Sequence, residues 1–133
     1  MPGMDAASGL ADLRRAEALL PKLLYAVDAK LTAASPVTDV AQLTGLASAA
    51  VAAGGGHVLG TSHVLFPNGA ITLVLILAES HLSIHTWPEE NLIAVDLFSC
   101  GAIDGQKVLD ELTAALRLTQ VHVRQVPRGL PAT

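Results

Sequence analysis

The stretch ITLVLILA, from Ile71 to Ala78, is apolar at every position except Thr72. The turn-forming residues Pro67, Asn68 and Gly69 stand just before it. A short apolar run after a turn, with no polar alternation, predicts a strand that is buried on both of its faces. Such a strand must lie in the middle of a sheet, so this stretch sets the architecture of the whole chain.

The segments around this strand supply the other expected elements. Leu92 to Ser99 alternates between two faces, and the Ala-rich segment after Thr38 or Asp39 has a helical apolar face that ends at Gly54. Strands are expected at 22–27, 57–66, 92–99 and 121–126, and helices at 10–20, 39–53 and 104–118. The expected fold is α+β, a two-layer sandwich of a mainly antiparallel sheet and two packing helices. Residues 1–20 are predicted to be an N-terminal extension and 21–133 a single domain.

Composition narrows the class of protein. The 133 residues are 51% hydrophobic, which is enough for one domain with a real core. A net charge of −4 and the lack of any Lys/Arg run argue against nucleic acid as a partner. The apolar runs are too short for a membrane span, and residues 1–9 do not resemble a signal peptide. We therefore expect a soluble, cytoplasmic protein with no membrane partner.

The residues directly after the central strand are the ones suited to chemistry. Glu79 to Gly101, ESHLSIHTWPEENLIAVDLFSCG, holds two histidines and the single cysteine, Cys100. A serine hydroxyl can attack the preceding carbonyl when the backbone is held in strain, and Ser80 stands where the strand ends. Cys100 has no partner for an internal disulfide, so it is either an inert core thiol or a reactive one.

The string ESHLSIHTWPE, followed by FSCG, closely resembles the pyruvoyl-dependent S-adenosylmethionine decarboxylase family in its short prokaryotic form. The likeness covers roughly residues 54–126 and includes the spacings from Ser80 to His85 and from Ser80 to Cys100. It implies self-cleavage between Glu79 and Ser80, with Ser80 becoming a pyruvoyl group that forms a Schiff base with the substrate amine. The resemblance makes His85 the proton acceptor in processing and Cys100 the proton donor. It also implies a homodimer of cleaved protomers.

The substrate is harder to predict, because residues around the motif depart from the family pattern. Phe66 and Trp87 stand at positions where the family carries rings, and Glu89 is a further candidate for substrate binding. The family's usual strings are replaced by LPKL at 20–23, AVD at 26–28, AITL at 70–73 and ENL at 90–92. We therefore expect an L-ornithine or L-arginine decarboxylase whose substrate cation is held by a carboxylate from Asp28, Glu89 or Glu90. The alternative is S-adenosylmethionine itself, and either substrate places the enzyme in polyamine biosynthesis.

Several residues keep a second interpretation. Thr72 occupies the position of a processing serine, and it is equally typical of a buried strand. His81 is expected to be structural. Together with His85 and Cys100 it would offer a zinc site, although we expect no metal. Finally, the chain could be an unprocessed homologue that serves as a binding or regulatory subunit.

Overall fold

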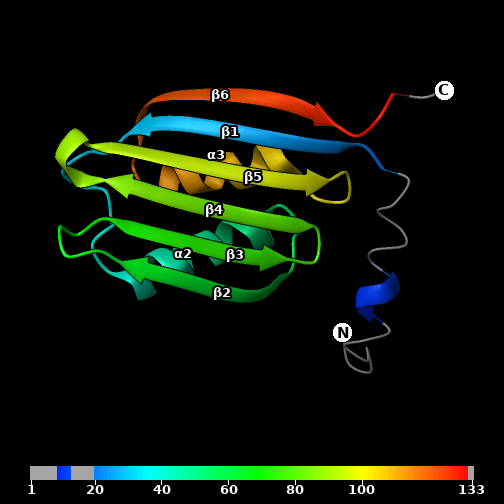
Figure 1. Cartoon of the computed structure of the whole chain (residues 1–133), viewed down its shortest axis with the longest axis horizontal. Helices are drawn as coiled ribbons and strands as arrows, with labels where there is room; N and C mark the ends of the chain where they lie inside the picture. The colour runs from blue at the N-terminus through cyan, green and yellow to red at the C-terminus, as the bar shows by residue number, and fades with distance from the viewer. Residues whose placement is uncertain (1–8, 13–19, 132–133) are drawn as a thin grey trace.

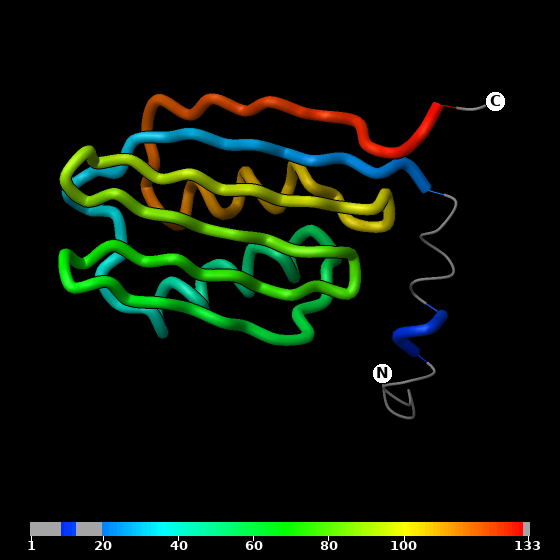
Figure 2. The backbone as a smooth tube through the Cα atoms, viewed as in Figure 1, coloured from blue at the N-terminus to red at the C-terminus, as the bar shows by residue number. Residues whose placement is uncertain are grey.

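The computed structural model describes residues 9–12 and 20–131, and its centre is one antiparallel sheet of six strands in the order β2-β3-β4-β5-β1-β6 (Figure 1). The strands are β1 (Lys22–Lys30), β2 (Val58–Leu65), β3 (Ile71–Leu77), β4 (Ser80–Trp87), β5 (Leu92–Cys100) and β6 (Thr119–Arg128). Figure 2 shows the chain running back and forth from β2 to β5 as consecutive hairpins, with β1 between β5 and β6. A short 3₁₀ turn, η1 (Pro88–Glu90), joins β4 to β5.

Both long helices, α2 (Val40–Ala53) and α3 (Gly105–Ala115), lie behind the sheet in Figure 1. Each helix begins at an aspartate that accepts hydrogen bonds from free backbone N–H groups of the first turn. The Asp39 carboxylate accepts from Ala41 N and Gln42 N, and the Asp104 carboxylate accepts from Lys107 N. Both helices cover the same face of the sheet, and neither of them lies on the opposite face, which we call the open face.

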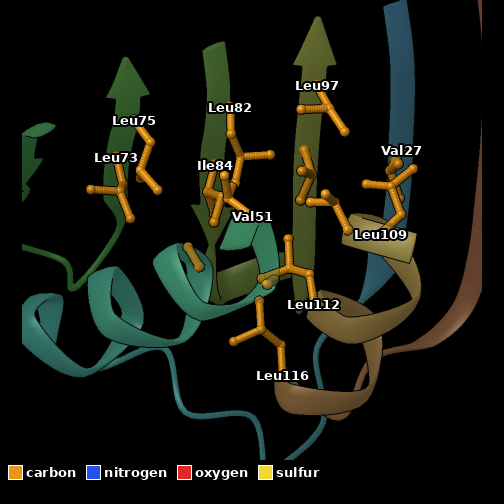
Figure 3. Close-up of a cluster of buried hydrophobic side chains, with 14 of the residues drawn as sticks. Val27, Val51, Leu73, Leu75, Leu82, Ile84, Leu97, Leu109, Leu112 and Leu116 are labelled. Carbon is orange, nitrogen blue, oxygen red and sulfur yellow. The ribbon is translucent and has the colours of Figure 1, made fainter. Parts of the chain in front are cut away.

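The core lies between the sheet and the helices (Figure 3). It contains mainly leucine, isoleucine and valine side chains from β1, β3, β4, β5 and both helices. The labelled members are Val27, Val51, Leu73, Leu75, Leu82, Ile84, Leu97, Leu109, Leu112 and Leu116. This arrangement confirms the predicted α+β sandwich.

The central strand differs from its prediction in one respect. Ile71, Leu73, Leu75 and Leu77 are buried against the helices, but Ile76 on the open face is 53% exposed. The strand is interior in the sheet, as expected, yet within one chain it is buried on only one side. The reason is that α2 and α3 both lie on the other face of the sheet.

The element bounds otherwise agree with the predictions to within a few residues, with two exceptions. The motif segment after Glu79 is itself a strand, β4, which the sequence analysis did not predict. Residues 9–12 are helical, and the rest of the helix expected at 10–20 lies largely outside the described residues. The division into an extension at 1–20 and a domain at 21–133 stays a prediction.

Candidate active site

Strand β4 presents both motif histidines and Trp87 on the open face. Side chains alternate along a strand, so Leu82 and Ile84 enter the core while His81, His85 and Trp87 point away from the helices. Because β4 is flanked by β3 and β5, both of its edges are hydrogen-bonded to neighbouring strands. The motif histidines are therefore fixed on a rigid interior strand and not on a loop.

Thr72 and His85 form a pair on the open face. They are direct cross-strand partners in the β3–β4 ladder, and Thr72 Oγ1 lies 3.3 Å from His85 Nδ1. The ring of His85 also lies next to that of Trp87, with centroids 6.2 Å apart and planes tilted by 33°. The Thr72 hydroxyl is thus in hydrogen-bonding contact with the imidazole, which lets it fix the orientation of the ring.

A cleft of about 560 Å³ opens beside this pair. Its walls come from the start of β3, the end of β4, the turn before β3 and η1. The lining residues are Phe66, Pro67, Asn68, Ala70, Thr72, His85, Thr86, Trp87 and Glu89. The Asn68 side chain ties the two turns together, since its Nδ2 donates to Glu89 Oε2 at 3.3 Å and its Oδ1 accepts from Ala70 N at 3.1 Å. The cleft therefore combines two aromatic rings, a carboxylate and the Thr72–His85 pair.

Ser80 begins β4 in a strained backbone conformation. Its φ angle is 141°, a region that residues with a side chain rarely adopt. Ser80 pairs with Leu77 across a turn of only two residues, Ala78 and Glu79, so the chain reverses direction right at the proposed cleavage point. The strain that the sequence analysis proposed at this bond is therefore present on its serine side.

Glu79 is the residue before this bond, and its side chain is 1% exposed. Its carboxylate accepts two hydrogen bonds from one residue, from His57 N to Oε1 at 2.8 Å and from His57 Nδ1 to Oε2 at 2.7 Å. His57 is not predictable as a functional residue, because nothing in the order of residues links position 57 to position 79. Only the pairing of β2 with β3 brings the two together.

Cys100 lies at the same end of the sheet as Ser80. It is the last residue of β5, is 4% exposed and pairs with Lys22 of β1. His81 of β4 is the cross-strand partner of Phe98 of β5. Ser80 directly precedes His81, and Cys100 lies two residues after Phe98. The catalytic serine and cysteine predicted from the sequence therefore share one end of the sheet.

His85 is not at that end. It stands five residues along β4 from Ser80, which at about 3.3 Å per residue is roughly 16 Å. One chain thus brings Thr72 and His85 together, and places Ser80 near Cys100, but separates the two groups. The predicted catalytic roles of these four residues stay predictions.

The carboxylates expected to hold a basic substrate are dispersed. Asp28 and Glu90 line a different cavity of about 250 Å³, where the Asp28 carboxylate lies 3.4 Å from Arg124 Nη2. Glu89 is the one of the three that lines the cleft beside His85. The structure therefore does not gather these acids around one substrate position.

The zinc alternative finds no geometric support. No group of three or more His, Cys, Asp or Glu side chains suited to a metal occurs among residues 9–12 and 20–131. The His81 ring instead stacks on Phe98, with centroids 6.1 Å apart and planes within 14°.

In the part of the chain that the structure describes, no helix is long and apolar enough to cross a membrane.

Comparisons with known proteins extend the likeness beyond the motif. The family model described as S-adenosylmethionine decarboxylase matches residues 23–129. An S-adenosylmethionine decarboxylase proenzyme of Symbiobacterium thermophilum is 40% identical over 104 residues, which cover 77% of this chain and 79% of that one. Proenzyme 2 of Bacillus anthracis is 39% identical over 77 residues, and the match spans 63% of its length. The crystal structure of the adenosylmethionine decarboxylase from Aquifex aeolicus superposes with a TM-score of 0.74 at 27% identity, over 85% of this chain and 94% of that chain.

As a class, the matched proteins are decarboxylases and decarboxylase proenzymes. Within this class, the chain belongs to the S-adenosylmethionine decarboxylase family. Membership confirms the predicted family. The matched region begins about 30 residues earlier than the motif likeness indicated.

Proposed function

We propose that the chain is a self-processing decarboxylase of S-adenosylmethionine. The observation that carries this proposal is the cleft on the open face, where Phe66 and Trp87 lie beside the Thr72–His85 pair. Aromatic faces suit the substrate, because its adenine can stack on a ring and its sulfonium is attracted to ring faces. The cleft's volume, about 560 Å³, is also in the usual range for small-molecule sites.

Self-cleavage would begin at the strained Ser80. Its hydroxyl attacks the Glu79 carbonyl carbon, and the C–N bond breaks as an ester replaces the amide, which leaves the nitrogen of Ser80 as a free amine. A base then removes the Cα proton of Ser80, the Cβ–O bond breaks, and Glu79 departs with a carboxylate. The dehydroalanine left at position 80 is then hydrolysed by water, which releases its nitrogen as ammonia and leaves a ketone. The strained φ of 141° supports the first step, because conversion to the flexible ester relieves it.

The pyruvoyl group supplies an electrophilic carbonyl that takes up the substrate's amine and accepts the electron pair released with carbon dioxide. This chain's residues would bind the substrate and move protons. We assign proton removal during processing to His85, with Thr72 orienting its ring. The thiol of Cys100, held near position 80, is assigned the return of a proton to the product.

A second copy of the chain would complete the site. His85 and Ser80 of one chain are roughly 16 Å apart along β4, too far for direct proton transfer. We propose that two copies pack through their open faces, related by a two-fold axis that runs across the strands near Ser83, the middle of β4. This rotation reverses the strands, so His85 of each copy lies over the end of β4 that carries Ser80 in the other.

The open face has the composition such an interface needs. Ile76, Val64 and Val126 share this face by register and are 43–53% exposed in the single chain. Half-buried Phe98 and Val74 lie between them. An apolar sheet face left open by the helices is a typical site of protein association.

The expected preference for L-ornithine or L-arginine is not retained as the main proposal. Two of the three carboxylates behind it, Asp28 and Glu90, lie away from the cleft. The named relatives are all S-adenosylmethionine decarboxylases or the proenzymes of such decarboxylases. S-adenosylmethionine is therefore the better-supported substrate.

The substrate test uses purified chain and measures carbon dioxide release from S-adenosylmethionine, L-ornithine and L-arginine. We expect release from S-adenosylmethionine alone, and two fragments, 1–79 and 80–133, on a denaturing gel. Ser80→Ala should give one intact band and no release. A wild-type chain that stays whole would instead favour the unprocessed binding homologue, and release only from a basic amino acid would refute the substrate.

The shared site is tested by mixing two inactive chains. Ser80→Ala and His85→Ala chains carrying different tags are co-expressed, and the heterodimer is isolated with both tags. Its one complete site combines Ser80 of the His85→Ala chain with His85 of the Ser80→Ala chain. We expect the His85→Ala chain to be cleaved in this heterodimer but not alone. Failure to cleave there, while a wild-type chain cleaves when paired with Ser80→Ala, would refute a site built from two copies.

A further inference from the structure

His57 holds the acyl side of the proposed cleavage point through three hydrogen bonds. Its backbone N–H and its ring Nδ1 each donate to one carboxylate oxygen of Glu79, and its carbonyl accepts from Ala78 N at 2.9 Å. Residue 57 thus binds both residues of the two-residue turn that carries the strained Ser80. We refer to these three contacts as the His57 clamp.

The clamp compensates a charged group buried in the protein. The Glu79 side chain is 1% exposed, whereas that of His57 is 56% exposed. An ionised carboxylate only accepts hydrogen bonds, so Nδ1 of His57 is the donor to Oε2. A buried carboxylate without such donors would move toward water, because its desolvation would be uncompensated. The His57 ring therefore keeps the Glu79 side chain inside the protein.

Keeping Glu79 inside also fixes the peptide group that reacts. A positive φ at a non-glycine residue persists only where the surrounding structure enforces it. Ser80 is bound on its C-terminal side by the β4 ladder, and the residue before it is bound by the His57 clamp. If Glu79 were released, the two-residue turn could rotate and the φ of Ser80 could relax.

We propose that His57 is a positioning residue for self-cleavage, which holds the Glu79 carbonyl in place for attack by the Ser80 hydroxyl. The inference rests on the proposed function, since it concerns the cleavage assigned there. His57 touches neither the hydroxyl nor the scissile bond and acts through Glu79. Its effect falls on the first step, formation of the ester, and not on the later removal of the Cα proton.

Three substitutions separate this role from a general effect on the fold. His57→Leu removes the ring donor and keeps the two backbone contacts. His57→Asn is the conservative variant, because its side-chain amide places a donor near the position of Nδ1. His63→Leu is the matched control, because His63 is a second exposed histidine, lies in β2 and makes no hydrogen bond to Glu79.

The experiment measures the first-order rate at which each full-length chain converts to two fragments on a denaturing gel. Loss of one charge-assisted hydrogen bond to a buried carboxylate predicts a rate roughly tenfold lower for His57→Leu. We expect His57→Asn to recover most of that loss and His63→Leu to match the wild type. The stability of each substitution is measured separately in a Ser80→Ala background, so that all chains compared are uncleaved. The cleavage rates are then measured under conditions in which every variant is folded.

A nucleophile that cleaves esters identifies the slow step. Hydroxylamine should not restore the rate of His57→Leu, because that variant accumulates no ester; full restoration would overturn the assignment to the first step. Cleavage of a folded His57→Leu chain at the wild-type rate, or an equal loss in His57→Asn and His57→Leu, would overturn the positioning role while leaving the proposed function intact. A wild-type chain that never cleaves would refute the proposed function, and the inference with it.

Discussion

Replacing Ser80 by glycine or by alanine gives two uncleavable chains that differ in how well they tolerate the backbone at this position. At φ 141° a side chain costs on the order of 1–3 kcal/mol, and glycine avoids that cost. Glycine loses more backbone freedom on folding than alanine, which lowers its stability by roughly 0.5–1 kcal/mol. The difference predicts that Ser80→Gly is more stable than Ser80→Ala by about 1 kcal/mol.

The assay is urea unfolding of both purified chains, followed by circular dichroism. With the usual dependence on urea, a difference of this size moves the midpoint by about 0.5 M. Ser83 provides the matched control, because it lies in the same strand without a positive φ. In a Ser80→Ala background, Ser83→Gly should be less stable than Ser83→Ala by about 0.5–1 kcal/mol, the opposite order.

A Ser80→Gly chain no more stable than the Ser80→Ala chain would contradict this prediction. That result would mean that the Ser80 backbone is not strained in the uncleaved chain, and strain could then not assist the attack on Glu79. An equal preference for glycine at positions 80 and 83 would be just as damaging, because the effect would not be specific to the cleavage point.

Four further predictions concern packing and binding. Gly45→Ala should raise the unfolding free energy by about 0.5–1 kcal/mol, since an added Cβ meets nothing within 4 Å in the interior of α2. Gly105→Ala should lower it by about 1–3 kcal/mol, since the added Cβ would overlap the ring of Tyr25, and one denaturation series measures both variants. Leu97→Ala should lower it by about 2–5 kcal/mol, because this fully buried side chain leaves a cavity in the core, and an unchanged urea midpoint would contradict the packing. Trp87→Ala should raise the KM for S-adenosylmethionine by about tenfold with little change in the fraction of cleaved chain, while an unaltered KM would argue against the cleft as the adenosyl site.

Much of the fold could be predicted from local pattern. The alternation in β5 and the capping aspartate of α2 each specify an element through contacts within a few residues. Strand β4 was missed because its residues were interpreted for their chemistry, although Leu82 and Ile84 alternate with polar neighbours. The open side of β3 could not be predicted, because an apolar run does not reveal which of its faces a helix covers.

The order of residues alone was enough to identify the family and to predict Ser80, His85 and Cys100 as catalytic residues, because their spacing is a property of the chain order. Their distribution in space follows from the folded sheet alone. The extended rise of β4 separates His85 from Ser80, and the pairing of β2 with β3 brings His57 to Glu79. Sequence spacing gives no distance until the backbone conformation is known, and contacts between distant residues exist only once the sheet has formed. The physical case for a shared site and for a clamped cleavage point therefore comes from the sheet.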